Sequence, residues 1–251
     1  MAEHQISLGS TLEALLEDKK YSTIKDILIT INPADIAAIF EDLQQEQLPL
    51  LFRLLPKELA AETFVEMDSD SQKLLIHGFS DSELREVLDE LYVDDAVDLV
   101  EEMPANVVKK VLQNADEGTR KTINQFLNYP ENSAGSLMTI EYVDLHDYFT
   151  VRKAMDYIRR TGIDKETIYT CYVTKGHKLI GLVSVKDLLL CEDDNATIES
   201  IMTDHVITVN TLDDQEQVAQ MFSKYDFLAL PVVDTESRLV GIVTFDDAMD
   251  V

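Results

Sequence analysis

A duplication in the C-terminal half of the chain limits the possible folds more than any other feature. The segment SLMTIEYVDL (136–145) matches SIMTDHVITV (200–209), and IGLVSVKDLL (180–189) matches VGIVTFDDAM (240–249). Residue numbers differ by 64 in the first matched pair and by 60 in the second, so the first copy holds four extra residues between its two segments. Each copy has the pattern strand, helix, strand, strand, helix. The duplication therefore predicts two equivalent α/β subdomains.

The segment 1–130 has the pattern of stacked helices. Glycine occurs there only as Gly9, Gly78 and Gly118, and apolar residues recur three and four positions apart. Similar segments recur at a nearly constant spacing, beginning at Asp35, Glu58, Glu83 and Asn106, with alternate helices beginning near Leu48, Ser71, Asp94 and Glu117. A hairpin of two short helices does not bury its apolar stripe alone. The repeat therefore predicts an α-superhelix of stacked helical hairpins, right- or left-handed.

The helical and duplicated regions meet at a stretch typical of a hinge, the sequence NYPENSAG at residues 128–135. We expect a multi-domain α and α/β protein with a helical superhelix over 1–130. The hinge and first copy follow over 131–197, and the second copy covers 198–251. No apolar run approaches the roughly 20 residues of a spanning helix, so the chain as given is expected to be soluble, without direct membrane insertion.

Charge narrows the possible partners. Asp and Glu number 48 against 21 Lys and Arg, which gives a formal net charge of −27. This balance excludes a nucleic-acid phosphate binder, which needs a basic face. The charge is spread over both regions, at −15 for 1–130 and −12 for 131–251. The two regions should repel each other, and cations between them would draw them together.

The sequence gives no sign of a catalytic centre. None of the five histidines forms a metal-binding pair or a pattern typical of nucleophilic catalysis, and no glycine-rich phosphate loop is present. The two cysteines, Cys171 and Cys191, match no zinc or redox motif and are expected to be reduced thiols. The chain is therefore not predicted to be an enzyme.

One short motif, G-x-x-[ST]-x-x-D, occurs once in each copy and has two interpretations. Its residues are Gly181, Ser184 and Asp187 in the first copy and Gly241, Thr244 and Asp247 in the second. A hydroxyl followed three residues later by a carboxylate is close to a capping box, which satisfies the free N–H groups at a helix start. The same two groups could instead hold the ribose and phosphates of a nucleotide.

Paired acids form a second candidate site. Asp94 and Asp98 lie four residues apart on one predicted helix, and further acids stand at Glu62, Glu216 and Asp226. Acids near a helix start are ordinarily dipole partners or part of a solvated face. Like charges at this spacing nevertheless repel, which a bound cation would relieve. Mg²⁺ binds one or two carboxylates and keeps several waters, which suits scattered acid pairs.

The two copies, with their S-[LI]-M-T openings, the LPVVD strand and the G-x-V-[ST] strands, resemble a tandem pair of CBS domains. The resemblance implies a cleft between the copies that binds adenine nucleotides such as ATP. Its candidate residues are Tyr169, Lys186, Asp187, Phe227 and Thr244. An aromatic ring would stack on adenine, and Asp187 would accept from ribose hydroxyls. The alternative is an empty cleft that serves only as a dimer scaffold.

The helical region, the hinge YPENSAGSLMT (129–139) and the two copies ending in GIVTFDDAMDV together resemble the cytosolic part of MgtE-type magnesium channels and transporters. This resemblance implies a homodimer on the cytoplasmic face of the cell membrane that senses Mg²⁺. Bound ions would join the helical domain to the CBS pair and close the pore of the transmembrane domain. The implied Mg²⁺ ligands are Glu62, Asp94, Asp98, Gly135 through its carbonyl, Glu216, Asp226, Asp247 and Asp250.

The family has a connecting helix and a membrane domain after the second CBS copy, whereas this sequence stops at Val251. We therefore expect a fragment in which some ion sites are incomplete. Two rival functions stay open. One is an adenine-nucleotide sensor without metal dependence, and the other is an adaptor whose superhelix grips a partner helix.

Overall fold

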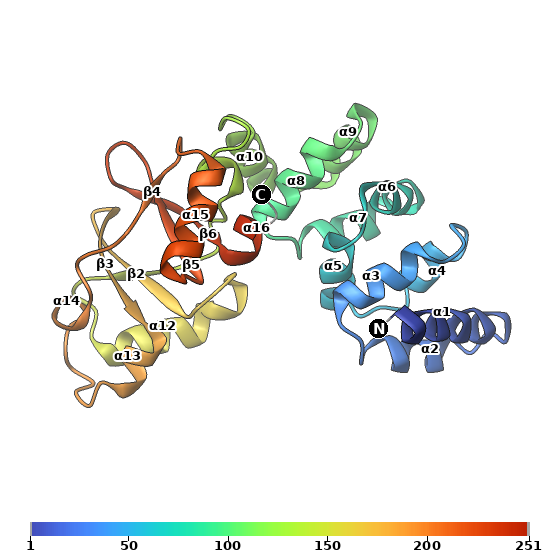
Figure 1. The fold of residues 1–251 in the computed structure, drawn as a ribbon, viewed down its shortest axis with the longest axis horizontal. Helices are drawn as coiled ribbons and strands as arrows, with labels where there is room; N and C mark the ends of the chain where they lie inside the picture. The colour runs from blue at the N-terminus through green and yellow to red at the C-terminus, as the bar shows by residue number, and fades with distance from the viewer. Residues whose placement is uncertain (1, 250–251) are drawn as a thin grey trace. The chain divides into compact units, whose positions relative to one another are not determined.

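A computed structural model describes residues 2–249, with the backbone alone for residues 2–7. The chain divides into two compact units (Figure 1). One holds the residues up to 91 together with 95–121, and the other holds 92–94 and the residues from 122 onward. The boundary expected at residue 130 differs from this division. The units divide between residues 121 and 122, so the second half of the helix over Glu117–Phe126 groups with the hinge that follows it.

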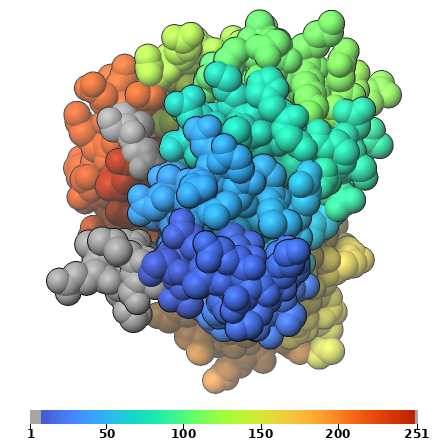
Figure 2. Space-filling view, turned by 90° about the vertical axis from the view of Figure 1, so that its right-hand side faces the viewer, coloured from blue at the N-terminus to red at the C-terminus, as the bar shows by residue number. Residues whose placement is uncertain are grey.

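The helical unit consists of short helices stacked in chain order. The described helices of this region are α1 (Ala2–Glu17), α2 (Tyr21–Leu28), α3 (Pro33–Glu41), α4 (Leu48–Phe52), α5 (Lys57–Val65), α6 (Ser69–Gly78), α7 (Asp81–Leu88), α8 (Val93–Glu102), α9 (Ala105–Asn114) and α10 (Glu117–Phe126). α3, α5, α7 and α9 pack one on the next, and α4 packs on α6. The hairpins form successive layers in the space-filling view (Figure 2). The predicted hairpin repeat is confirmed.

Local sequence signals explain where these helices begin and end. α3 begins after Asn32, whose side chain accepts from the Ala34 N–H at 3.1 Å. α7 begins with a complete capping box between Ser80 and Glu83. At the other end of a helix, the Lys110 ammonium donates to the carbonyls of Ile76 and Phe79, which satisfies acceptors that α6 leaves free.

Each C-terminal copy is a three-stranded sheet with helices. The first has β1 (Val143–His146), β2 (Thr170–Lys175) and β3 (Lys178–Ser184), with α12 (Val151–Thr161), the 3-10 turn η1 (Gly162–Asp164) and α13 (Val185–Leu190). The second has β4 (Val209–Asn210), β5 (Ala229–Val233) and β6 (Leu239–Thr244), with α15 (Gln215–Tyr225) and α16 (Phe245–Met249). In both, the middle strand pairs parallel with the first and antiparallel with the third. The predicted element order is confirmed, and short helices α11 (Ala134–Leu137) and α14 (Ile198–Ile201) precede each copy's first strand.

The two copies hold each other through their matched motifs. The backbone of Thr139 exchanges two hydrogen bonds with Ile242, and that of Thr203 exchanges two with Leu182. Beside each bridge a glycine permits the close approach. A Cβ on Gly181 would lie 2.5 Å from Met202 Sδ, and one on Gly241 would lie 2.6 Å from Met138 Sδ. The Met-Thr opening of each copy thus packs against the G-x-V strand of the other.

The hinge docks on the second copy. The Ala134 N–H donates to the Asp213 carbonyl at 2.8 Å, and the Gly135 N–H donates to the Thr211 carbonyl at 2.9 Å. A Cβ on Gly135 would lie 2.7 Å from the Tyr129 ring and 2.8 Å from the Thr211 oxygen. Close packing is therefore sufficient reason for a glycine at this position.

Candidate functional site

The repeated G-x-x-[ST]-x-x-D motif forms a capping box at the start of α13 in the first copy, and its hydroxyl–carboxylate hydrogen bond recurs in the second copy. Ser184 Oγ donates to Asp187 Oδ2 at 2.5 Å and accepts from the Asp187 N–H at 3.0 Å. Thr244 Oγ1 donates to Asp247 Oδ2 at 2.5 Å. The capping interpretation is confirmed. It does not exclude a ligand at Asp187, because no described residue hydrogen-bonds its second carboxylate oxygen.

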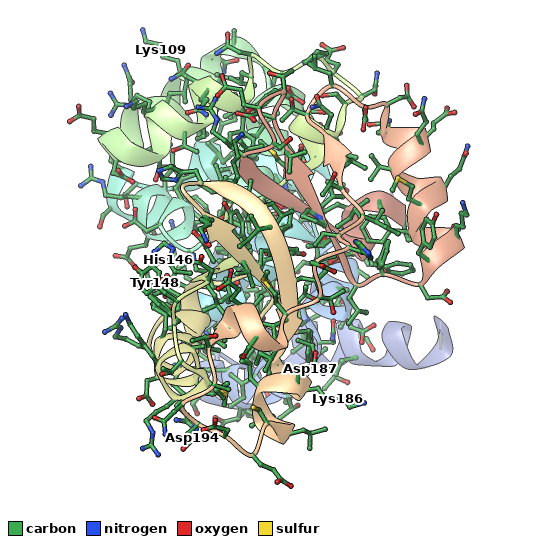
Figure 3. All side chains as sticks on the ribbon, turned by 90° about the vertical axis from the view of Figure 1, so that its left-hand side faces the viewer. Lys109, His146, Tyr148, Lys186, Asp187 and Asp194 are labelled. Carbon is green, nitrogen blue, oxygen red and sulfur yellow. The ribbon has the colours of Figure 1, made fainter. Side chains whose placement is uncertain are left out.

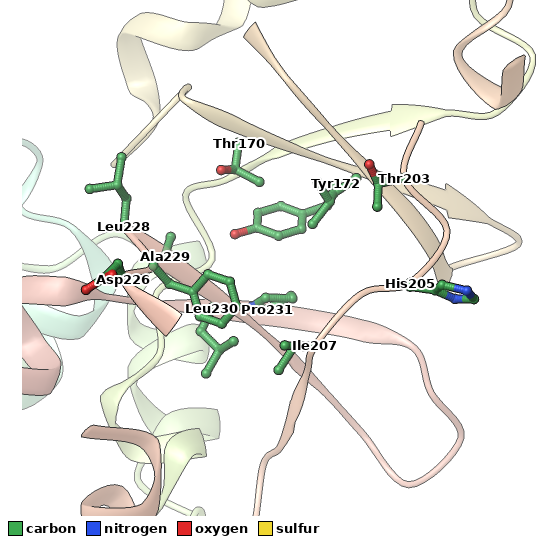
Figure 4. Close-up of a pocket in the computed structure, with 12 residues that line it drawn as sticks. Thr170, Tyr172, Thr203, His205, Ile207, Asp226, Leu228, Ala229, Leu230 and Pro231 are labelled. Carbon is green, nitrogen blue, oxygen red and sulfur yellow. The ribbon is translucent and has the colours of Figure 1, made fainter. Parts of the chain in front are cut away.

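A cavity of about 410 Å³ lies between the two copies (Figure 4). Most of its wall is apolar, and five of the lining residues have polar side chains. Its lining residues are Thr170, Tyr172 and Leu182 from the first copy and Thr203, His205, Ile207, Asp226, Phe227, Leu228, Ala229, Leu230 and Pro231 from the second. A mainly apolar cleft with a few convergent polar groups is typical of a small-molecule site.

The residues predicted to bind a nucleotide differ in their position relative to this cavity. Phe227 lines it directly. Tyr169, 68% exposed, precedes the lining residue Thr170, and its carbonyl accepts from the Val185 N–H at the start of α13. Lys186 and Asp187 follow in that helix (Figure 3).

Thr244 neighbours a lining residue of the second copy. It pairs with the lining residue Ala229 across β5 and β6 and is buried. Of the five predicted positions, Phe227 lines the cavity and Tyr169 and Thr244 neighbour lining residues, whereas Lys186 and Asp187 lie in α13, outside the lining.

Sequence reasoning missed the central residue of this wall, Tyr172. Its side chain is 0% exposed, and burial raises the pKa of its hydroxyl. Because side chains alternate between the two faces of a strand, Thr170 and Tyr172 lie on the same face of β2. Thr170, the polar residue after the predicted Tyr169, was therefore the signal that could have pointed to Tyr172. His205 was missed because its segment, between α14 and β4, has no regular pattern.

The predicted Mg²⁺ ligands of the helical region and the hinge differ in exposure. Glu62 on α5 and Asp98 on α8 are exposed, whereas Asp94, one turn before Asp98, is only 8% exposed. Gly135 is buried.

The predicted ligands of the second copy that the structure describes lie at different points along α15 and α16. Glu216, in the first turn of α15, is exposed. Asp226 ends that helix in a left-handed conformation, with φ of 54°, and lines the cavity. Asp247 caps α16, and Asp250 lies outside the described residues.

These positions fit a hydrated ion better than a preformed cage. Among the described residues, no group of three or more His, Cys, Asp or Glu side chains converges as metal ligands. Mg²⁺ can bind where few protein ligands are available, because it keeps several waters and takes one or two carboxylates. Any site built from these acids would therefore be weak and rich in water.

Comparison with known proteins identifies a helical region followed by two CBS copies. A family model described as the MgtE intracellular N domain matches residues 31–132, and the CBS domain model matches 134–192 and 198–251. A crystal structure of the cytosolic domain of the Mg²⁺ channel MgtE in complex with ATP is 36% identical. It covers 96% of this chain and 99% of that one, with a TM-score of 0.89. The chain belongs to the MgtE family. The resemblance to MgtE and to a CBS pair is confirmed.

Other MgtE proteins extend the comparison. The magnesium transporter MgtE of Thermus thermophilus is 37% identical over 97% of this chain, and that of Bacillus subtilis is 30% identical over 94%. A crystal structure of the soluble part of a magnesium transporter gives a TM-score of 0.89 at 30% identity, covering 100% of this chain and 97% of that one. The chain spans about half the length of the two curated relatives, 55% and 52%.

Within residues 2–249, no helix has both the length and the apolar character needed to cross a membrane.

Proposed function

We propose that this chain is the cytosolic regulatory region of a magnesium transporter or channel and that it senses Mg²⁺. The observation that carries the proposal is the match over 96% of the chain to the cytosolic domain of an MgtE Mg²⁺ channel. In this proposal the region works as a homodimer joined through its CBS domains. It acts on a transmembrane pore domain from the cytoplasmic side and catalyses no reaction.

Charge supplies the physical basis of sensing. The segment 1–130 carries −15 and the segment 131–251 carries −12, so the two regions repel when no cation lies between them. Cations bound by acids of both regions would favour the joined, closed state. A site at 100 times its Kd stabilises the state that binds by about 2.7 kcal/mol. A few weak sites are therefore enough to shift a two-state equilibrium.

Small-angle scattering with and without millimolar Mg²⁺ tests this proposal. We expect the radius of gyration to fall when Mg²⁺ is added. The Asp94→Asn/Asp98→Asn variant should compact less, because it removes two of the proposed ligands. Asp42→Asn/Glu46→Gln is the matched control, since it removes two exposed acids of the same region and should compact like the wild type. An unchanged radius in the wild type would contradict sensing by compaction.

A second candidate function is binding of an adenine nucleotide, which the cavity beside Phe227 favours. A relative of the same architecture was crystallised with ATP. In this proposal adenine stacks on Phe227, Asp187 accepts from the ribose hydroxyls and Lys186 attracts the phosphates. Calorimetry with ATP and AMP in EDTA tests it. Tight binding without Mg²⁺-driven compaction would identify a nucleotide sensor that is indifferent to metal.

A further inference from the structure

One polar group in the wall of the cavity has no partner. The Tyr172 hydroxyl is buried and makes no hydrogen bond with any described residue. Figure 4 shows its ring projecting among the lining residues, with the oxygen directed toward Leu228 and Ala229. Because a buried polar group without a partner is costly, an orphan hydroxyl in a cavity wall indicates that a ligand completes it.

The backbone holds this hydroxyl in place. Tyr172 lies in the central strand of its sheet and pairs with Asp144 on one side and Leu182 on the other. Its ring meets the Tyr142 ring edge to face, with centroids 6.0 Å apart. The side chain is therefore fixed before any ligand arrives, which favours a contact that selects among ligands.

The position along the strand indicates which part of a nucleotide the hydroxyl meets. Thr170 and Tyr172 share one face of β2, about 7 Å apart at the usual rise of a strand. The proposed phosphate and ribose residues, Lys186 and Asp187, follow Val185, whose N–H donates to the carbonyl of Tyr169, the residue before Thr170. Around Tyr172 the wall is apolar, with Leu182, Leu230 and Pro231 among its residues.

We infer that the Tyr172 hydroxyl is a specificity-determining contact that hydrogen-bonds an edge of the nucleotide base. This inference rests on the nucleotide-binding function proposed above. A tyrosine hydroxyl can donate to a ring nitrogen or accept from an exocyclic amino group. Because the surrounding wall is apolar, the hydroxyl favours a base with a hydrogen-bond donor or acceptor facing it. A flat ring without such an atom would leave the hydroxyl unpaired.

Calorimetry on Tyr172→Phe, with ATP, AMP and adenosine in EDTA, tests the inference. We expect about tenfold weaker binding, the effect of one lost hydrogen bond to a buried group, and the same factor for all three ligands. Tyr142→Phe is the matched control, since it removes a neighbouring tyrosine hydroxyl that does not line the cavity, and it should bind like the wild type. Without ligand, Tyr172→Phe should melt no lower than the wild type, because it removes an unpaired hydroxyl.

Each other outcome overturns a different step. Wild-type affinity in Tyr172→Phe would refute the contact and leave the nucleotide function standing. A loss for ATP but not for adenosine would place the hydroxyl at the phosphates. A lower melting temperature of the free Tyr172→Phe variant would make its role structural. If the wild type binds none of the three ligands, the nucleotide function fails and the contact fails with it.

Discussion

The two CBS copies have one fold but different charge. Each carries 11 acids, yet the first copy (131–197) has eight Lys and Arg and the second (198–251) only two. Their net charges are therefore −3 and −9. The helix after the first strand differs most, since α12 carries Arg152, Lys153, Arg159 and Arg160 where α15 has Lys224 alone.

The four extra residues of the first copy also change the surroundings of the cavity. In the second copy α15 ends at Asp226, and the chain enters β5 through residues that line the cavity. In the first copy the equivalent segment passes through η1, and the Glu166 N–H donates to the Glu141 carbonyl at 2.8 Å. Equivalent loops therefore have different surroundings.

This contrast indicates that duplication preserved the scaffold while the chemistry of each copy diverged. Of the residues that we assign to the nucleotide, Tyr169, Tyr172, Lys186 and Asp187 lie in the first copy, and Phe227 and Thr244 lie in the second. The side-chain Mg²⁺ ligands proposed for the CBS pair, Glu216, Asp226, Asp247 and Asp250, lie in the second. We therefore infer that the ribose and phosphate contacts of the nucleotide lie in the first copy, whereas the side-chain cation ligands of the CBS pair lie in the second.

The strongest effect should come from the shared scaffold. Gly181→Ala and Gly241→Ala should each destabilise the CBS pair by about 1–3 kcal/mol, because the new methyl groups meet Met202 and Met138 in equivalent contacts. Thermal unfolding measures both. Gly9→Ala, with open space around it in α1, should instead stabilise by about 0.5–1 kcal/mol. Sharply unequal losses for Gly181 and Gly241 would contradict an equivalent scaffold.

The next effect separates the two capping carboxylates. Asp187→Asn should weaken ATP binding in EDTA about tenfold, because it removes a charged acceptor for the ribose hydroxyls. Asp247→Asn makes the same change in the second copy and should leave ATP affinity unchanged. Calorimetry compares the two variants, and equal losses would mean that both capping carboxylates contact the nucleotide.

The same two variants should have the opposite order of effects on the Mg²⁺ response. Asp247→Asn should raise the Mg²⁺ concentration at half-maximal compaction about two- to fivefold, the effect of a single partly exposed charge worth about 0.4–1 kcal/mol. Asp187→Asn should leave the midpoint unchanged. Scattering across a Mg²⁺ titration provides the comparison. A shift in Asp187→Asn alone would place the cation side in the first copy.

The weakest effect is a difference in acid sensitivity between the copies. The Lys175 ammonium, 2.8 Å from the carboxylate, lowers the pKa of Asp147, whereas the equivalent residue in the second copy is the neutral Thr211. A lowered pKa stabilises the fold above the ordinary value of about 3.9, and the gain disappears as pH falls below it. The melting-temperature gap between wild type and Asp147→Asn should therefore shrink in acid. The gap for Thr211→Val should be independent of pH, and a constant gap for Asp147→Asn would refute the ion pair.

Much of this architecture is predictable from sequence, because repeats force it. The regular spacing of the helical repeat located α3, α5, α7 and α9, and the duplicated motifs located both sheets. The short helix α11 was missed, since the Gly and Ser of AGSL are typical of a loop. Its first two N–H groups donate instead to the carbonyls of Asp213 and Thr211, residues distant in the sequence.

The site was predictable only where a motif carried it. Asp187 and Phe227 followed from the resemblance to a CBS pair, whereas Tyr172 belongs to no motif. Its importance arises from burial and from a missing hydrogen-bond partner, which are properties of the folded chain. The metal ligands stay predictions, since the proposed acids form no cluster of three or more among the described residues that would mark them as ligands.

Residue-resolved NMR titration of backbone amides, first with Mg²⁺ and then with ATP in EDTA, is the sharpest test of this division between the copies. We predict that Mg²⁺ shifts the amides of Glu216, Asp226 and Asp247 more than those of the first copy. ATP should shift Thr170, Tyr172 and Phe227 and the start of α13. Mg²⁺ shifts spread equally over both copies, or ATP shifts that avoid the cavity, would contradict the division.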